Sequence, residues 1–326
     1  MKNKFLIFFL IFCLLFSFAS CSTSKTENNS STFNIVTSFN PLYSFLLYLT
    51  DGAANINVST MVPSTTGCLH DYQLLPKDLK VLENADLFII NGAGMEGFIS
   101  LAINNYPTLS ILDSSHNIKL LKNYSAEDLL HPGHNKHDEH EHDHDHSGHD
   151  EHSHEYNSHI WLSLSNAAVQ VKNIADELIR LNPQNSSVYE KNLNSLLIGI
   201  NKLKESQTKL LLNKNLKVLS FNPIFDYFLN DSNILSYYML DDIENSPSAY
   251  YLSKLITFTN NAKNTDNELS CIVTDINYPP SVVKAICDET NIPVITLNSL
   301  VEGDINKDSY ISAMAQNIAV LSNILN

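Results

Sequence analysis

The chain is poor in positive charge and in glycine-rich loops, and each shortage argues against a class of function. Its 326 residues hold 20 Lys and Arg against 35 Asp and Glu, a formal net charge of −15. This deficit argues against nucleic acid as a partner, because phosphate binding requires clustered Lys and Arg. The Asn-Gly-Ala-Gly segment at 91–94 lacks the third glycine and the downstream acid of a dinucleotide-binding loop.

Cysteine is also scarce. The N-terminal segment described in the next two paragraphs accounts for Cys13, which is removed, and Cys21, which is lipidated. Only Cys68, Cys271 and Cys287 then remain as free thiols or disulfide partners. An odd number in an exported protein excludes a complete disulfide framework. Pairing of Cys271 with Cys287 stays open, because their separation cannot be read from sequence. Cys68 is expected to be a small buried hydrophobe, with a thiolate ligand as the alternative.

The first twenty residues have the pattern of a secretory signal. Lys2 and Lys4 form a short basic region, and residues 5–16 are an uninterrupted apolar run. That run is too short for a comfortable membrane span, so we expect residues 1–20 to be removed on export.

Small residues precede Cys21, and Phe18-Ala19-Ser20-Cys21 resembles a bacterial lipobox with Phe where Leu is more usual. The resemblance implies that Cys21 becomes the lipidated first residue of the mature chain, exported and anchored to the outer, or periplasmic, face of the cell membrane. Several acyl chains anchor a protein firmly, whereas one alone is marginal. The polar residues 21–32 then form a flexible tether. Cleavage with free secretion is the alternative.

Histidine is concentrated in residues 131–154, where ten of twenty-four residues are His, seven are Asp or Glu, and only Lys136 is basic. Apolar side chains are almost absent, so we expect a disordered His-rich loop over residues 131–158. Neutral imidazole suits zinc, copper, nickel or iron, and interleaved carboxylates hold cations close. This tract therefore indicates metal binding; a solvated acidic loop without function is the alternative.

Only three histidines lie outside that tract, namely His70, His116 and His159. His70 follows the second predicted strand, and ligands of open α/β sheets bind beyond the carboxyl ends of strands. His159 lies where the loop returns to packed structure. Each alone is more typical of a hydrogen-bonded structural histidine, but together, beside a metal-attracting loop, they indicate coordination. His116 is expected at the surface.

Strand-like and helix-like runs alternate along the chain, which predicts an α/β fold. Residues 183–212 keep Leu and Ile returning to one face with almost no Gly or Pro, which predicts a connecting helix about 45 Å long. About three hundred residues remain after processing, enough for two lobes. We expect an N-terminal lobe at 33–182, the linker helix at 183–213 and a C-terminal lobe at 214–326.

The individual elements follow from apolar runs and their Gly, Pro and Asn boundaries. The predicted strands cover residues 33–39, 55–62, 86–91, 109–113, 216–221, 234–239, 269–275 and 293–297. The predicted helices cover residues 41–50, 76–84, 96–104, 166–181, 183–212, 223–229, 247–260, 280–290 and 309–325.

Several segments, in order, carry a family resemblance over essentially the whole mature chain. They are residues 67–72 with 76–78, 91–96, 159–162 with 166–167, Asn185, Tyr189 and Asn192 of the long helix, and 243–248. In this order they resemble the bacterial ABC-importer solute-binding lipoproteins that capture zinc or manganese.

The resemblance implies two α/β lobes, each with a four-stranded, mostly parallel sheet flanked by helices, joined by one long rigid helix. It places a metal ion in the cleft between the lobes, held by His70 and His159 from the first lobe. The third ligand, a His or Glu in relatives, falls on Asn222, and the fourth, often an Asp, on Asn298. The implied partners are an ABC permease and its ATPase, with the protein acting as a monomer.

Asn222 and Asn298 depart from the family pattern, because a neutral amide oxygen does not offset the charge of a divalent cation. Three outcomes stay open. A carboxylate such as Asp275, or a histidine of the loop, completes the shell; water completes it and leaves a weaker site; or the cleft has lost metal and the loop alone binds it. If the alignment near Asn222 is shifted, Asp226 is the nearest acid.

The expected function is therefore capture of zinc, or a similar divalent transition metal, for delivery to a permease. Manganese is less expected because Mn²⁺ prefers oxygen ligands over a His-rich loop. A metal-buffering or adhesin-like surface lipoprotein with a degenerate cleft is the alternative. We expect no enzyme: a zinc hydrolase needs an open metal position and a general base, and the sequence has no His-Glu-x-x-His or Gly-x-Ser-x-Gly motif.

Overall fold

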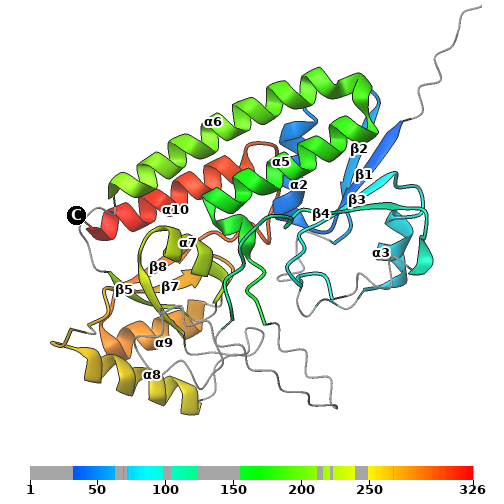
Figure 1. Ribbon diagram of the computed structural model, residues 1–326. Helices are drawn as coiled ribbons and strands as arrows, with labels where there is room; N and C mark the ends of the chain where they lie inside the picture. The colour runs from blue at the N-terminus through cyan, green and yellow to red at the C-terminus, as the bar shows by residue number, and fades with distance from the viewer. Residues whose placement is uncertain are drawn as a thin grey trace, which may run out of the picture. The chain divides into compact units, whose positions relative to one another are not determined.

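Figure 1 shows the computed structural model, in which two four-stranded sheets are accompanied by helices. Among the described residues, no helix is both long enough and apolar enough to cross a bilayer. The predictions for the signal at 1–20, for Cys21 and for the tether lie outside the described residues, apart from Thr32. The described residues are 32–62, 69, 72, 74–97, 104–123, 155–210, 216–220, 223–238, 249–266, 268–278 and 280–325.

The first sheet contains β1 (Phe33–Thr37), β2 (Ile56–Thr60), β3 (Leu87–Ile90) and β4 (Ser110–Asp113). Its strand order is β2-β1-β3-β4, and all three pairings are parallel. The Leu-Phe-Ile-Ile sequence of β3 is buried along its whole length, as expected for a parallel strand covered on both faces. Helices α2 (Asn40–Leu49) and α3 (Pro76–Val81) connect its strands.

The second sheet repeats this arrangement with β5 (Lys217–Ser220), β6 (Leu235–Tyr238), β7 (Cys271–Asp275) and β8 (Val294–Leu297). Its order, β6-β5-β7-β8, is the order of the first sheet shifted by four strands, and its pairings are again parallel. We call each sheet with its helices a lobe. The helical elements of the second lobe are η5 (Pro223–Phe225), α7 (Asp226–Asp231), α8 (Ala249–Ala262), α9 (Pro280–Thr290) and α10 (Ser309–Leu325).

Two long helices follow the first sheet. The Ser163 hydroxyl caps α5 (Leu164–Leu181) by accepting a hydrogen bond from the Asn166 amide at 3.1 Å. The 3₁₀ turn η4 (Pro183–Asn185) comes next, and α6 (Ser186–Leu210) then extends over 25 residues, about 37 Å. The predicted α-helix thus begins at Ser186, three residues later than expected, because the turn that Pro183 opens is 3₁₀.

Helix α6 does more than connect two parts of the chain. It contacts α5 and α2 of the first lobe and α10 of the second, and Figure 1 shows α6, α5 and α10 running alongside one another. Tyr189, Leu196 and Ile200 of α6 are buried in a core cluster that also contains residues from both lobes. The apolar face that the periodicity predicts is therefore used for packing along the helix.

Two further local expectations differ from the structure. Glu96 and Gly97, predicted as helix, are not helical, and residues 98–103 lie outside the described residues. The predicted loop at 131–158 ends too late, because Tyr156 pairs with Lys122 in an antiparallel bridge, and residues 157 and 158 are buried; residues 131–154 lie outside the described part of the chain.

The open question of a second-lobe disulfide is answered. Cys271 and Cys287 are both free, so they do not pair. Burial of Cys271 in β7 raises the pKa of its thiol to about 12, which keeps it in the unreactive protonated form. Cys68 lies outside the described residues.

Candidate metal centre

Two of the four predicted ligands, His159 and Asn298, lie among the described residues, whereas His70 and Asn222 lie outside them. Asn298 directly follows β8, and the stretch between Ser220 and Pro223 that contains Asn222 directly follows β5. The carboxyl ends of parallel strands are where open α/β sheets bind ligands. Asn298 therefore lies at the expected edge of the sheet, and the prediction for Asn222 falls outside the described residues.

The described residues nearest to His70 in the sequence are Leu69 and Tyr72. Leu69 is buried, with 1% of its surface exposed. The Tyr72 amide donates a hydrogen bond to the Leu69 carbonyl at 3.1 Å. The Tyr72 hydroxyl donates to the Asp78 carboxylate of α3 at 2.6 Å. Tyr72 is thus tied to the helix α3 that follows it in the chain.

His159 is a buried side chain at the start of the 3₁₀ turn η3 (Ile160–Leu162), with 2% of its surface exposed. Its Nδ1 lies 2.9 Å from the Asn157 side-chain oxygen, which also accepts the His159 backbone N–H at 2.9 Å. The imidazole packs against the Trp161 ring at a centroid distance of 5.3 Å. The ring is therefore held in one orientation by a hydrogen bond and an aromatic neighbour.

The residues flanking His159 reach the second lobe at two points. The Asn157 side-chain amide donates to the Pro223 carbonyl at 2.7 Å, and Pro223 is the residue after Asn222. The Trp161 indole N–H donates to the Ser299 carbonyl at 2.8 Å, and Ser299 is the residue after Asn298. One short segment around a buried histidine thus contacts the immediate neighbours of both second-lobe candidates.

Asn298 uses its side chain to build the turn after β8. Its Oδ1 accepts the Leu300 amide at 2.8 Å, and Leu300 adopts a positive φ of 65°. Asn317 of α10 clamps the Asn298 backbone, accepting from its N–H at 2.8 Å and donating to its carbonyl at 2.9 Å. An amide oxygen has two lone pairs, so this turn leaves one acceptor position on Oδ1.

Asp275, the alternative carboxylate, ends β7 directly beside β8, where it is paired in register with Leu297. Its carboxylate accepts the Ser299 amide at 3.1 Å and the Asn277 amide at 2.8 Å. Burial raises the pKa of Asp275, and the hydrogen bonds from Ser299 and Asn277 oppose that rise. This acid lies next to the turn that contains Asn298.

Asp226, the acid expected nearby if the alignment shifts, is buried at the start of α7. Its carboxylate accepts the Asn157 side-chain amide at 3.2 Å. Asp226 is therefore one hydrogen-bonded residue removed from His159. Among the described residues, no three His, Cys, Asp or Glu side chains come together in a group that could hold a metal ion.

A buried carboxylate that is linked through Asn91 to the residue before His159 was not recognised from the sequence. Glu96 accepts hydrogen bonds from the Ser38 hydroxyl at 2.7 Å, the Asn91 amide at 2.8 Å and the Gly92 amide at 3.0 Å. The Asn91 side chain in turn donates to the Ser158 carbonyl at 2.9 Å. Burial raises the pKa of Glu96 to about 7 against the effect of these donors. The sequence signal for this network is the position of Asn91 and Gly92, five and four residues before Glu96.

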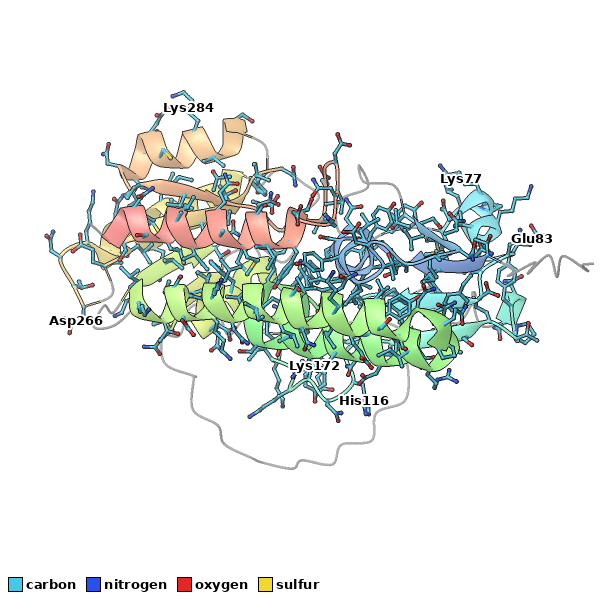
Figure 2. All side chains as sticks on the ribbon, turned by 90° about the horizontal axis from the view of Figure 1, so that it is seen from above. Lys77, Glu83, His116, Lys172, Asp266 and Lys284 are labelled. Carbon is cyan, nitrogen blue, oxygen red and sulfur yellow. The ribbon has the colours of Figure 1, made fainter. Side chains whose placement is uncertain are left out.

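His116 lies at the surface, as expected, in the turn after β4. Asn173 of α5 donates to the His116 carbonyl at 2.9 Å, which fixes the backbone of this turn. Figure 2 shows His116 and Lys172 both projecting outward. His116 is therefore a useful reference for a histidine that takes no part in the candidate centre.

Comparison with known proteins supports the fold over almost the full length. Residues 35–324 match the ZnuA family, described as the periplasmic component A of the zinc-uptake complex. The high-affinity zinc uptake system protein ZnuA of Yersinia pestis is 29% identical over 291 residues, covering 86% of this chain and 88% of that protein. The manganese ABC transporter substrate-binding lipoprotein PsaA of Streptococcus pneumoniae is 24% identical over 341 residues, covering 100% of both.

A solved structure agrees with the fold. The solute-binding protein FpvC of Pseudomonas aeruginosa, in complex with Ni²⁺, superimposes with a TM-score of 0.70 at 21% identity, covering 90% of this chain and 97% of that one. At this identity the likeness concerns the fold alone. It confirms the predicted architecture of two four-stranded parallel sheets, with flanking helices and one long helix. The names of the first two proteins refer to zinc and manganese, and the third was solved with Ni²⁺, so these relatives do not single out one metal.

Proposed function

This chain belongs to the ZnuA family of zinc-uptake components, and from that premise we propose that it is the extracytoplasmic substrate-binding protein of an ABC transporter. It captures zinc, or a similar divalent transition metal, and delivers the ion to a membrane permease driven by an ATPase. Lipidated Cys21 anchors the monomeric mature chain to the membrane, and residues 21–32 give it reach.

The observation that carries this proposal is the position of His159 between two contacts with the second lobe. Asn157 binds Pro223, and Trp161 binds Ser299, at 2.7 and 2.8 Å. Pro223 and Ser299 are the sequence neighbours of the proposed ligands Asn222 and Asn298, and consecutive Cα atoms are only about 3.8 Å apart, which supports the choice of these two residues. A cation bound by His159 is therefore offered ligands from both lobes.

We propose that the metal is held by His70 and His159 of the first lobe together with Asn222 and Asn298 of the second. Two imidazoles and two neutral amides leave the charge of a divalent cation uncompensated. Asp275, beside the Asn298 turn, is the described carboxylate best placed to supply the missing charge, with water or a histidine of the 131–154 tract as the other candidates. The lobes are proposed to divide at 33–182 and 214–326, with 183–213 between them.

Zinc is the favoured cargo because the proposed histidines and the His-rich tract offer nitrogen ligands, whereas Mn²⁺ prefers oxygen. The tract would raise the local zinc concentration beside the cleft. Manganese stays the alternative cargo, since the manganese lipoprotein PsaA of Streptococcus pneumoniae aligns with the entire chain.

A pair of single-histidine variants tests the proposal. In a chelator-competition titration with Zn²⁺, His159→Ala of the mature chain is expected to weaken the tightest site about 100-fold or more, as is His70→Ala. His116→Ala makes the same chemical change at an exposed position and should leave that site unaltered. Anomalous scattering at the zinc edge then identifies the ligating atoms. Equal zinc affinities of the His159→Ala and His116→Ala variants would show that the tightest zinc site is not in the cleft.

A metal-buffering or adhesin-like surface lipoprotein is the second candidate. It is favoured by the neutral residues at 222 and 298, and by the finding that the described residues contain no cluster of three ligand side chains of the His, Cys, Asp or Glu type. The two candidates differ in transport. If deletion of the gene prevents growth when zinc is scarce, the importer is supported. If zinc accumulation inside the cell is unchanged but fewer zinc ions are bound at the cell surface, the buffer is supported.

A further inference from the structure

The Asn157 side chain has partners at both ends, although it is buried with only 1% of its surface exposed. At one end, Oδ1 accepts the His159 backbone N–H and lies 2.9 Å from His159 Nδ1. At the other end, Nδ2 donates to the Pro223 carbonyl at 2.7 Å and to the Asp226 carboxylate at 3.2 Å. One amide thus joins a first-lobe histidine to the start of the second-lobe segment 223–226.

These four partners fix the orientation of the amide and the proton on the imidazole. A backbone N–H only donates, so the Asn157 atom facing the His159 backbone must be the oxygen. A carbonyl only accepts, so the atom facing Pro223 must be the nitrogen. Because Asn157 Oδ1 is an acceptor, His159 Nδ1 must carry a proton. In the neutral ring the lone pair is then on Nε2, the nitrogen able to bind a metal.

We propose that Asn157 is a positioning residue for His159: it sets the imidazole tautomer that presents Nε2 to the metal, and it ties that ring to the segment following Asn222. The inference rests on the proposed function, in that His159 is taken as a metal ligand. Residues that accept the second N–H of a ligating histidine orient the ring and raise its basicity. Here the same residue also joins the ligand to the other lobe.

The backbone of Asn157 is held by the same part of the second lobe. Tyr227 of α7 donates its hydroxyl hydrogen to the Asn157 carbonyl at 2.8 Å and accepts the Leu121 amide at 2.9 Å. Burial raises the pKa of Tyr227 to about 12, so this hydroxyl stays protonated and remains a donor. Main chain and side chain of Asn157 are therefore both fixed against residues 223–227.

Only an amide satisfies both ends of this link. A carboxylate of the same shape would still accept from His159, but it would leave the partly buried Pro223 carbonyl without this donor and would place a second negative charge against Asp226. Asn157→Asp therefore separates the two roles, because it keeps the tautomer contact and breaks the contact between lobes. Asn157→Ala removes both.

The test uses the full mature chain and reads the ¹⁵N resonances of the His159 ring by NMR. In the metal-free wild type, Nδ1 is expected to be protonated and Nε2 unprotonated. Added Zn²⁺ is expected to shift the Nε2 resonance. Asn157→Ala should lose the Nδ1–H preference and weaken Zn²⁺ binding about 10- to 100-fold. Asn157→Asp should retain the tautomer but unfold at lower urea, and the double variant with Asp226→Asn should regain part of that loss, because a donor again faces residue 157.

Asn173→Ala is the matched control, since it also removes two hydrogen bonds from a side-chain amide to backbone carbonyls, those of Ser114 and His116. It should change neither the His159 tautomer nor the zinc affinity. A wild type protonated on Nε2 would overturn the inference, as would an Asn157→Ala variant indistinguishable from Asn173→Ala in tautomer and affinity.

The outcome also separates this inference from the proposed function. If Zn²⁺ leaves every His159 resonance of the wild type unchanged, the proposed cleft site is wrong, whatever the tautomer. If Zn²⁺ shifts the ring but the metal-free ring is protonated on Nε2, the site stands and the role of Asn157 is wrong.

Discussion

The Trp161 indole N–H donates to the Ser299 carbonyl at 2.8 Å and joins residues 138 positions apart in the sequence. Trp161 is completely buried, and its own carbonyl accepts the Tyr310 hydroxyl of α10 at 2.8 Å. Phe39 packs edge-on against the Trp161 ring with centroids 5.0 Å apart. This indole therefore fixes the distance between the segment carrying His159 and the turn carrying Asn298.

We expect Trp161→Phe to lower the free energy of unfolding by about 2–4 kcal/mol. The smaller Phe ring leaves a cavity where the indole packed, and the buried Ser299 carbonyl loses its donor. It should also weaken zinc binding several-fold, since the Asn298 turn loses its bond to the segment that carries His159. Urea unfolding and Zn²⁺ titration measure the two effects. Tyr106→Phe is the control: it removes a hydrogen bond to the Leu79 carbonyl within the first lobe. It should cost stability and leave affinity unchanged; an equal loss of affinity in both variants would contradict the role given to Trp161.

Glu96 predicts a pH dependence of stability. Burial raises its pKa from 4.5 to about 7, so the unfolded chain ionises this group at lower pH than the folded chain does. The stabilisation is complete below pH about 4.5 and is lost as the pH rises through about 7, a change of about 3 kcal/mol at 1.36 kcal/mol per pKa unit. Above that pH the contribution is constant.

The Glu96→Gln variant should lack this pH dependence. Urea unfolding of wild type and variant at pH 5 and pH 8 gives the comparison: the wild type should lose stability relative to the variant between these two values. The amide nitrogen of Gln also has to replace one of two acceptor oxygens, either Oε1, which faces the Ser38 hydroxyl and the Asn91 amide, or Oε2, which faces the Gly92 amide. The variant is therefore expected to be less stable at both pH values. Parallel curves would show that Glu96 ionises normally.

The elements of the fold were predictable because they depend on local patterns. The Leu-Phe-Ile-Ile run of β3 and the Pro at the start of α3 are recognisable without any partner in space, and both elements lie within the predicted ranges. The beginning of α6 was misplaced because the 3₁₀ turn at Pro183 has the same sequence signal as a first α-helical turn.

The candidate site was predictable only in part. His159 stands out because histidine is rare outside the tract, so its chemistry is visible in composition. The bonds from Asn157 to Pro223 and from Trp161 to Ser299 span 66 and 138 residues, and no local pattern encodes them. Glu96 was likewise predicted only as the first residue of a helix, because no local pattern reveals its three hydrogen-bond donors.

Removal of the His-rich tract should lower the amount of zinc bound without unfolding the protein. The chain entering and leaving this region is paired: the Asn123 amide donates to the Glu155 carbonyl at 2.9 Å and the Asn157 amide to the Leu121 carbonyl at 2.8 Å. A short linker in place of residues 131–154 therefore joins two strands of chain that already lie together, and the stability should change by no more than about 1 kcal/mol.

Metal analysis of the purified variant then counts the ions lost with the tract. We expect fewer zinc ions per chain but a retained tightest site, and His70→Ala in the full chain should weaken that site more than the deletion does. An unchanged zinc count would show that the tract binds none. If the deletion weakens the tightest site more than His70→Ala does, the principal site lies in the tract.

Asn298→Asp tests whether the missing charge limits the proposed centre. The substitution keeps the shape of the side chain and its acceptor for the Leu300 amide, so the turn after β8 is preserved. It adds a carboxylate, which offsets the charge of a divalent cation where a neutral amide does not, and we expect Zn²⁺ to bind about 10-fold more tightly, equivalent to about 1.4 kcal/mol. The nearby Asp275 carboxylate should make the metal-free variant slightly less stable through like-charge repulsion.

The control for this charge is Asn306→Asp. Asn306 forms the same kind of turn, its Oδ1 accepting the Asp308 amide at 2.9 Å, at an exposed position. Both variants add one negative charge to the second lobe, so a general electrostatic attraction of cations would tighten binding equally in the two. Tighter binding confined to Asn298→Asp identifies residue 298 as a ligand. Binding that stays at the wild-type level in both variants shows that residue 298 does not reach the metal, and Asp275→Asn then becomes the variant expected to abolish the tight site.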